Sequence, residues 1–527
     1  MLLRFASCLT ASLFAFSPFV FGAPAEPAKP KLVVAIIVDQ FRYDYLTRFR
    51  ADYHGGFDQL LTQGADFTNA FYQQVPTVTA VGHSIFLSGA MPSVSGIISN
   101  NWYDRDEGKI VTSVCDWDQK QVGGGHGEAE GPKCTDADPA SPKRLLVSTL
   151  GDELRTANPQ SKVVGVSIKA RGAILPSGHR AAGAYWFDDE TGNFITSTFY
   201  MKELPDWANT FNKQKLAAQY VDRKWEGFPQ WNFHAPAGSK LPYLNIPASP
   251  WGNELIEGFA EAALTGEQLG KRGVTDLLTV SFSSNDYVGH RTGPDAPEVR
   301  DMAIRTDQLL AKLFKRIDAT VGMKNTVVVL SADHGVASAP AQNAASKMPG
   351  GYLHADLEDA VTTALDRKFG KASWLMPGAG ETTLYFNYDA FKTVKREEVL
   401  SAARDVILAI PQSHVARVYT REQMDNGVNG DFIVRAEMNG YYPRRSGDLF
   451  LVFEPNYIPG SSGTSHFSPY AYDRHVPVLF MGPGIKPGRY NETIAPNDIA
   501  PTLATMLAIQ TPSGSSGRVL TEMLTPP

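Results

Sequence analysis

The sequence predicts an α/β fold with a mostly parallel central sheet that is sandwiched by helices. The first observation is a set of apolar, β-branched segments that each stop at a polar residue: KLVVAIIVDQ, SKVVGVSIKAR, VTDLLTVSFSSND, NTVVVLSADHG and HVPVLFMGPG. Continuous apolar runs of this length are typical of strands buried on both faces of a parallel sheet. The second is that stretches with helical periodicity, such as PEVRDMAIRTDQLLAKLFKRI, lie between several of them. The third is the composition, since 43% hydrophobic and 20% charged residues can form a sizeable core.

The N-terminus has the features of a secretory signal. Arg4 precedes an apolar run, and small residues and prolines follow near a possible cleavage site at Ala23-Pro24-Ala25. The alternative is an N-terminal membrane anchor, but the apolar stretch is short and is broken by Ser17-Pro18. We therefore expect residues 1–25 to be a signal peptide. The protein would be secreted, and periplasmic in a Gram-negative bacterium.

Two cysteines remain after the signal is removed. Cys115 and Cys134 bracket the Gly-rich segment DWDQKQVGGGHGEAEGPK. An even number of cysteines in an exported protein predicts a disulfide, which here would close a surface loop.

Charge and hydropathy exclude some classes of partner. A net charge of -6 and a pI near 6.0 provide no general basic surface for a nucleic-acid duplex or anionic lipid. After the signal, the sequence has no apolar run long enough to span a bilayer, so we expect no stable membrane insertion. The sequence indicates no protein partner. An anionic substrate must therefore be attracted by a local site.

We expect residues 26–527 to form one catalytic domain with two inserted cap segments. Residues from about 175 to 265 are rich in Trp, Tyr, Pro and Asn, and residues from about 345 to 460 have a mixed character. Long excursions on one rim of an α/β core commonly shape its site. Independent folding domains are the alternative interpretation.

Polar residues stand where the predicted strands end. In open α/β sheets the ligand site lies beyond the carboxyl ends of the strands, which is where Asp39, Lys169, Asp286 and Asp333 fall. Asp286 and His290 are four residues apart, so on a helical turn both side chains face one metal ion. Asp333-His334 can present carboxylate and imidazole together from a turn. Mixed Asp and His ligands suit zinc, with manganese or iron allowed on chemistry alone.

A threonine lies just before a predicted helix in VPTVTAVGHSIFLSG. Thr79 at this position would face backbone N–H groups and the positive end of the helix dipole, which favour an anion. The simpler interpretation is that Thr77 or Thr79 is only an N-cap. An alcohol becomes a good nucleophile when a base or metal stabilises its alkoxide, and a nearby zinc would do so.

Lys169 and Arg171 are two residues apart at a predicted strand end, so they are expected to point the same way and reach one ligand. The planar guanidinium can hold two phosphoryl oxygens, whereas the ammonium acts as a point charge. The alternative is an exposed basic strand end.

Seven motifs in order resemble those of a known family. They are VDQFRYDYL, PTVTAVGH, GIISNNWYD, SIKARGA, NDYVGHRTGP, SADHG and GTSHFSPYAYDRHVPVLFMGPGI. The chain thereby resembles the alkaline phosphatase superfamily. It is most similar to the phosphate-irrepressible alkaline phosphatase branch, which uses a threonine nucleophile and is related to the type I phosphodiesterases and nucleotide pyrophosphatases. The resemblance extends from about residue 32 to the DIAPTLATML segment near the C-terminus.

The resemblance implies a site with two Zn²⁺ ions. One would be held by Asp286, His290 and His466, and the other by Asp39, Asp333 and His334, with the Thr79 oxygen joining the second group. Thr79 rather than Thr77 matches the family nucleophile, because the phosphate-contacting asparagine then falls at Asn100, twenty-one residues on, and not at Asn101.

The implied activity is hydrolysis of small phosphate monoesters through a covalent phosphothreonine, with release of inorganic phosphate. Asn100, Lys169 and Arg171 would bind the non-bridging oxygens as catalytic and substrate-binding residues. The formal charges of the expected ions and side chains leave a positive surplus, which suits a monoester dianion better than a diester. A nucleotide phosphodiesterase or pyrophosphatase is the alternative enzyme. A sulfatase is disfavoured because no Cys or Ser in a C/S-x-P-x-R context was found, and a non-catalytic secreted binding protein is the alternative of another class.

Overall fold

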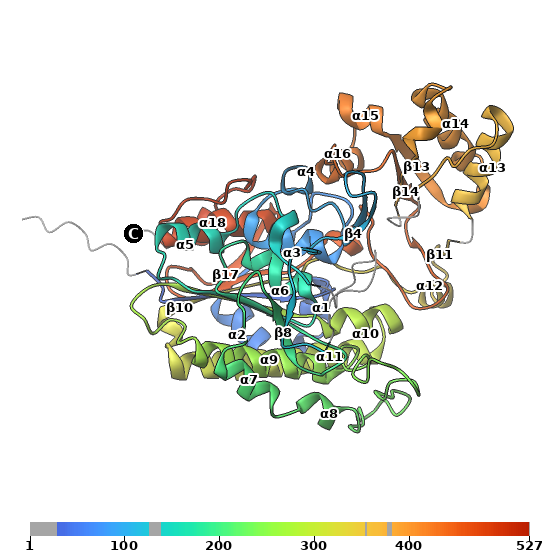
Figure 1. Cartoon of the computed structure of the whole chain (residues 1–527). Helices are drawn as coiled ribbons and strands as arrows, with labels where there is room; N and C mark the ends of the chain where they lie inside the picture. Colours follow the sequence, from blue (N-terminus) through green and yellow to red (C-terminus); the bar gives the residue numbers. More distant parts are fainter. Residues whose placement is uncertain (1–28, 126–138, 354–355, 377–381, 526–527) are drawn as a thin grey trace, which may run out of the picture.

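The computed structural model describes residues 29–125, 139–353, 356–376 and 382–525. They form a large sheet covered by helices on both faces, with a smaller lobe at one end (Figure 1). The predicted signal peptide and Cys134 lie outside the described residues.

The predicted strands form the centre of a ten-stranded sheet with the order β17-β2-β16-β10-β1-β9-β6-β7-β8-β5. β1 (Leu32–Val38) lies between β10 (Thr326–Ser331) and β9 (Asp276–Phe282), and β6 (Val163–Ser167) follows β9; these neighbours are all parallel. Every residue of these four strands is buried, as their uninterrupted apolar sequences predict. The predicted α/β fold is therefore confirmed.

The outer parts of the sheet make it mixed. β16 (Val478–Met481), which the sequence also predicts as a strand, runs antiparallel to β10 and to β2 (Ala65–Ala70), and β17 (Gly488–Ile494) is parallel to β2. At the other edge, β7 (Gly183–Phe187) is parallel to β6. β8 (Phe194–Ser197) runs antiparallel both to β7 and to β5 (Gln121–Val122).

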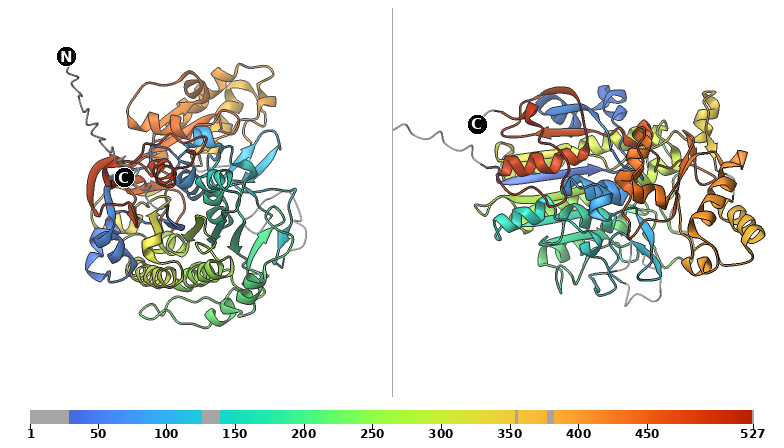
Figure 2. Two further views of the ribbon diagram at one scale, coloured as in Figure 1. Left: turned by 90° about the vertical axis from the view of Figure 1, so that its left-hand side faces the viewer. Right: turned by 90° about the horizontal axis from the view of Figure 1, so that it is seen from above.

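Helices form a layer on each side of this sheet (Figures 1 and 2). One layer contains α2 (Gly56–Gln63), α9 (Pro250–Gly266) and α11 (Pro297–Thr320). The other contains α3 (Thr79–Ser88), α5 (Leu150–Ala157), α6 (Ala170–Ser177) and α18 (Ile499–Leu507). The predicted helix PEVRDMAIRTDQLLAKLFKRI is α11.

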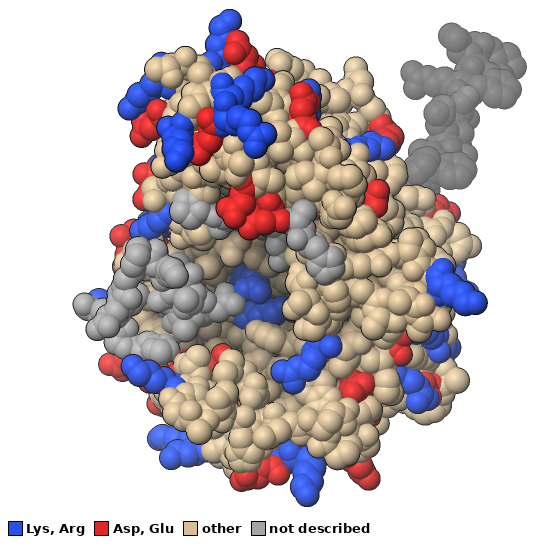
Figure 3. Space-filling model, turned by 90° about the vertical axis from the view of Figure 1, so that its right-hand side faces the viewer, with Lys and Arg blue, Asp and Glu red and all other residues tan. Residues whose placement is uncertain are grey.

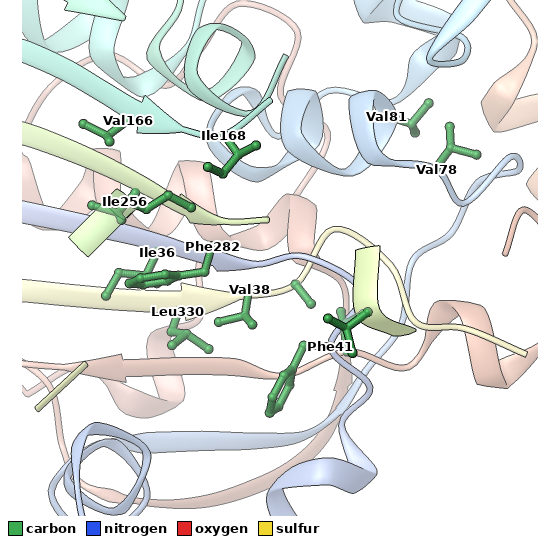
Figure 4. Close-up of a cluster of buried hydrophobic side chains, with 14 of the residues drawn as sticks. Ile36, Val38, Phe41, Val78, Val81, Val166, Ile168, Ile256, Phe282 and Leu330 are labelled. Carbon is green, nitrogen blue, oxygen red and sulfur yellow. The ribbon is translucent and has the colours of Figure 1, made fainter. Parts of the chain in front are cut away.

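The main core lies between the sheet and these helices. Figure 4 shows Ile36 and Val38 of β1 beside Phe282 of β9 and Leu330 of β10, with Val78 and Val81 at the start of α3. Burial of such side chains contributes about 1.5–3 kcal/mol each. The strand ends that carry the polar residues are thus held by a dry, close-packed support.

The segment from 175 to 265 is not one cap over the site. Its strands β7 and β8 extend the central sheet, and α9 covers one face of that sheet. Only the part with α7 (Asp206–Asn212) and α8 (Leu216–Tyr220) lies outside these layers, on the far side of α9 (Figure 1).

The segment from 345 to 460 forms most of the smaller lobe. Its three-stranded antiparallel sheet has the order β12-β14-β13, with β12 at Thr383–Leu384, β14 at Leu449–Phe453 and β13 at Val415–Thr420. Its helices are α13 (Leu357–Phe369), α14 (Arg396–Leu408), α15 (Arg421–Asn426) and α16 (Phe432–Gly440). This lobe lies at one end of the large sheet (Figure 1).

Short elements complete the chain. They are α1 (Asp44–Arg48), α4 (Pro92–Ser95), β3 (Asn101–Asp104), β4 (Lys109–Thr112), α10 (Ser284–Thr292), α12 (Pro340–Ala345), β11 (Gly351–Tyr352), β15 (Tyr457–Ile458) and α17 (Ala471–Arg474). None of the helices that the structure describes is both long and apolar enough to cross a bilayer.

Candidate active site

The carboxyl ends of the parallel strands bring the predicted acidic residues together. Asp39 follows β1, Asp333 follows β10, and Asp286 lies in the first turn of α10, which begins just after β9. Because β1 pairs in parallel with both β9 and β10, residues far apart in sequence emerge side by side.

Two groups of potential metal ligands result. Asp286, His290 and His466 form one, and Asp39, Asp333 and His334 form the other; within each group the ligand atoms lie within 4.8 Å of one another. The predicted spacing of Asp286 and His290 is realised on α10, where His290 Nε2 is 3.1 Å from Asp286 Oδ1. His466 comes from the loop that precedes α17.

The three imidazoles are oriented alike by backbone carbonyl groups. Nδ1 lies 2.8 Å from Thr464 O in His290, 2.8 Å from Thr77 O in His466, and 2.9 Å from Gly335 O in His334. A carbonyl oxygen can only accept, so each Nδ1 carries the proton and donates it. In the neutral imidazole, each Nε2 is then left with a lone pair. Metal-binding histidines are commonly held in this way.

These lone pairs converge in a manner that suits a cation. Nε2 of His290 is 3.2 Å from Nε2 of His466, and with both imidazoles neutral neither nitrogen has a proton to donate to the other. Oδ1 of Asp39 is buried and has no hydrogen-bond partner among the described residues, and Oδ2 of Asp333 is buried with only the His83 ring, at 3.1 Å, near it. A metal ion in the first group would satisfy these imidazoles, and one in the second group would satisfy these oxygens.

The pKa values of residues in the cluster also indicate a metal site. Burial and the neighbouring Asp286 and Asp333 carboxylates raise the pKa of Asp39 well above its usual range. Burial and the neighbouring His334 and His290 lower the pKa of His466, so this imidazole is neutral, as metal ligation requires. The donor set of carboxylates and neutral imidazoles therefore fits zinc.

Lys169 lies between the two groups. Its Nζ donates to Asp39 Oδ2 at 2.7 Å and to Asp286 Oδ2 at 2.6 Å, and the side chain is 3% exposed. Burial alone would lower its pKa, but the Asp286 and Asp39 carboxylates raise it, so the ammonium stays charged. A fixed positive charge thus lies at the junction of the two groups.

The predicted geometry of Lys169 and Arg171 is wrong. β6 ends at Ser167, Lys169 is the N-cap of α6, and Arg171 lies in the first turn of that helix. The two side chains therefore do not share a direction through strand alternation. Arg171 is still close enough to Lys169 for its charge to lower the pKa of the Lys169 ammonium.

Thr79 lies at the start of α3, as the sequence predicts. Its Oγ1 is 3.4 Å from His334 Nε2, in the second group of ligands. Thr77, in contrast, donates its hydroxyl to Ser468 O at 3.1 Å, and its own carbonyl accepts from His466. Thr77 is thereby occupied in holding a ligand histidine, whereas Thr79 faces the potential metal site.

Asn100 contacts the same helix start. Its Oδ1 accepts from the backbone N of Ala80 at 2.8 Å, which fixes the side-chain amide next to Thr79. With Oδ1 used in this way, the NH₂ group remains as a donor. Asn101 is exposed as the first residue of β3.

Sequence reasoning missed the role of Gln40. Its backbone N donates to Asp333 Oδ1 at 3.1 Å and its Nε2 donates to Asp286 Oδ1 at 2.7 Å, so it connects the two groups. Its φ of 59° is uncommon for a residue other than glycine. The only sequence signal is its place directly after Asp39.

His83, on α3, contacts residues of the site without lining the cavity. Its Nδ1 lies 2.8 Å from Thr79 O and its Nε2 lies 2.8 Å from Ser281 Oγ. It also lies 3.1 Å from Asp333 Oδ2. It therefore connects the start of α3 to β9 and to a ligand carboxylate without facing the cavity.

A cavity of about 450 Å³ opens onto this cluster. Thr79 is flanked by its lining residue Val78, and the lining also includes Asn100, His290 and His466. The other wall comes from the smaller lobe: Thr382, Thr383, Tyr385, Glu437, Gly440, Ser446 and Phe450. Seen from the end where that lobe lies, the surface is hollowed, with Lys or Arg side chains inside the hollow and acidic side chains on its rim (Figure 3).

An α/β sheet with two Asp/His groups and a threonine at its carboxyl edge defines a protein of the alkaline phosphatase superfamily. The family model for type I phosphodiesterase / nucleotide pyrophosphatase matches residues 33–470. The chain belongs to this family, which confirms the predicted resemblance.

Similar proteins cover nearly the whole chain. Alkaline phosphatase PhoV of Synechococcus elongatus is 38% identical, covering 96% of this chain and 95% of its own. Alkaline phosphatase PafA of Elizabethkingia meningoseptica is also 38% identical, covering 94% of this chain and 95% of its own. A crystal structure of wild-type PafA superimposes with a TM-score of 0.86 at 36% identity, covering 94% of this chain and 99% of that one.

Proposed function

We propose that this protein is an alkaline phosphatase that hydrolyses phosphate monoesters through a covalent phosphothreonine on Thr79. One observation carries the proposal: the Thr79 hydroxyl lies at a helix start, 3.4 Å from His334 Nε2, while Thr77 is engaged elsewhere. The similarity to PhoV and PafA, both named alkaline phosphatases, supports the choice of activity.

The proposed cofactors are two Zn²⁺ ions. One would be held by Asp286, His290 and His466, and the other by Asp39, Asp333 and His334 together with the Thr79 oxygen. Zinc bound there supplies a Lewis acid that lowers the pKa of a hydroxyl group and stabilises negative charge on oxygen.

The chain's own residues then perform two displacements. Thr79 Oγ1 loses its proton and forms a bond to phosphorus as the bond from phosphorus to the leaving alcohol oxygen breaks, and the alcohol oxygen takes up a proton. Water then attacks the phosphothreonine, the bond from phosphorus to Oγ1 breaks, and inorganic phosphate and free Thr79 result. The N–H groups at the start of α3 and the amide of Asn100 orient the phosphoryl oxygens in both steps.

Lys169 and Arg171 favour a monoester as substrate. Two cations beside the cluster complement the dianion of a monoester more than the single charge of a diester. The family match favours a second candidate, a nucleotide phosphodiesterase or pyrophosphatase, because that is the activity for which the family is named.

The test compares kcat/KM for an aryl phosphate monoester, the matched diester and the matched sulfate on zinc-loaded protein. We expect the monoester to be preferred, and a preference for the diester would move the second candidate to first place. Thr79→Ala should lose turnover by several orders of magnitude and keep its zinc, because six protein ligands remain. A label from the ester trapped at low pH should map to Thr79, and a label on Thr77 would contradict the mechanism.

Export, a disulfide and a single catalytic domain belong to the same proposal. We infer that residues 1–25 are removed on export, that residues 26–527 form the catalytic domain, and that Cys115 pairs with Cys134. N-terminal sequencing of the exported protein and non-reducing peptide mapping check the cleavage and the bridge. Two free thiols in protein from an oxidising compartment would exclude the bridge.

A further inference from the structure

One carboxyl group in the cavity has no function in the proposed mechanism. Glu437 lies on α16 and lines the cavity that also contains Asn100, His290 and His466. It is 6% exposed. Among the described residues that line the cavity it is the only acidic one, and the Lys and Arg side chains seen in the hollow are not among those lining residues (Figure 3).

Helix α16 is fixed to the loop that precedes Thr79. The backbone N of Val75 donates to Ala436 O at 3.0 Å. A Cβ on Gly440 would come within 1.7 Å of Val75 O, so only glycine permits this approach. Glu437 is one turn before Gly440, on the same side of the helix. Thr79 is four residues after Val75. These backbone contacts at Val75 therefore set the position of Glu437 relative to Thr79.

The carboxyl is unusual because no residue that the structure describes neutralises it. No hydrogen bond or ion pair to its side chain occurs within the described part of the chain, and burial alone raises its pKa to about 8. A buried carboxylate is costly unless a cation or several donors pair with it. The neighbouring walls offer apolar side chains, including Val78, Phe450 and Phe467.

We propose that Glu437 determines the specificity for the leaving group, by binding a primary ammonium on the alcohol part of the ester. The inference rests on the proposed monoesterase function. The phosphoryl group would occupy the cluster at Thr79 and Asn100, and the organic part would extend along the apolar wall toward Glu437. The substrates so defined are phosphate esters of amino alcohols.

The test uses pairs of esters that differ only in charge. Aminoalkyl phosphates of increasing chain length, from 2-aminoethyl phosphate upward, are each compared with the alkyl phosphate in which a methyl group replaces the ammonium. At pH 9 the carboxyl is ionised and the ammonium is still charged. At the best length we expect kcat/KM for the ammonium ester to exceed that of its partner at least about tenfold, or about 1.4 kcal/mol.

Glu437→Gln keeps the shape and removes the charge. It should bring this ratio to about one at every length, while kcat/KM for the alkyl esters changes by less than about threefold. Glu257→Gln is the matched control, since Glu257 is another buried carboxyl with a raised pKa but lines a different groove on α9. Its ratio should stay as in the wild type.

Three results would overturn the inference: a wild-type ratio near one at every length, an unchanged ratio in Glu437→Gln, or an equal loss on both members of each pair. Calorimetric binding of the same esters to Thr79→Ala gives the ratio without turnover. If the wild type hydrolyses no ester, the proposed function fails, and the binding ratio still decides the role of Glu437.

Discussion

Removing the two cations beside the cluster distinguishes the proposed monoesterase activity from the alternative phosphodiesterase activity. The perturbation is the double substitution Lys169→Ala and Arg171→Ala. Lys169 is 3% exposed, so solvent screens its charge only weakly. Contacts between a charged donor and a phosphoryl oxygen contribute about 1.5–3 kcal/mol each.

The loss of two such contacts raises the activation free energy by about 3–6 kcal/mol. Because about 1.4 kcal/mol corresponds to a factor of ten, kcat/KM for a monoester should fall by about three orders of magnitude. Diester hydrolysis places less charge on these oxygens and should fall by much less. Lys169 also donates to Asp39 and Asp286, where it competes with a metal ion, so its removal should not weaken metal retention.

The assay is the ratio of monoester to diester kcat/KM, with zinc content measured on the same samples. Lys162→Ala provides a matched control, because Lys162 lies just before the opposite end of β6 and pairs with Glu267 at 2.5 Å. Its ratio should not change. Equal losses on both esters with zinc intact would refute the monoester-specific role of the two cations, and loss of zinc would refute the argument about competition.

Three further substitutions test other parts of the site. Gly440→Ala places a Cβ 1.7 Å from Val75 O and should lower the free energy of unfolding by about 1–3 kcal/mol, seen as a lower denaturant midpoint; an unchanged midpoint would contradict the close approach. Gln40→Ala removes the 2.7 Å hydrogen bond to Asp286 and should weaken metal affinity about 10–100-fold in competition with a chelator, whereas equal affinity would rule out a positioning role. Burial raises the pKa of Glu437 from 4.5 in the unfolded chain to about 8, so the folded state holds this proton more tightly and stability decreases as pH rises between these values. Glu437→Gln should therefore be more stable than the wild type at pH 9 and gain less at pH 5, and a difference independent of pH would exclude the shift.

The sequence by itself determined the five neighbouring strands at the centre of the sheet, which are β16, β10, β1, β9 and β6, and the local pairs of candidate ligands. Uninterrupted β-branched runs predict strands that are buried on both faces of a sheet, and a spacing of four residues places Asp286 and His290 on one side of a helical turn. Both signals are local, since strand and helix periodicity act within a few residues. The expectation that Lys169 and Arg171 share a direction on a strand was wrong, because β6 ends at Ser167 and α6 begins at Ala170. The exact residue at which a strand ends is not visible in its apolar pattern.

Only the tertiary structure decided which distant residues face the cluster. Family resemblance, not spacing, assigned His466, and its place beside His290 depends on a loop held by Thr77 O. No sequence pattern placed Glu437 in the cavity, because that depends on the docking of α16 against the loop at Val75. The physical reason is that strand order and loop docking are set by packing between segments hundreds of residues apart, which local periodicity does not encode.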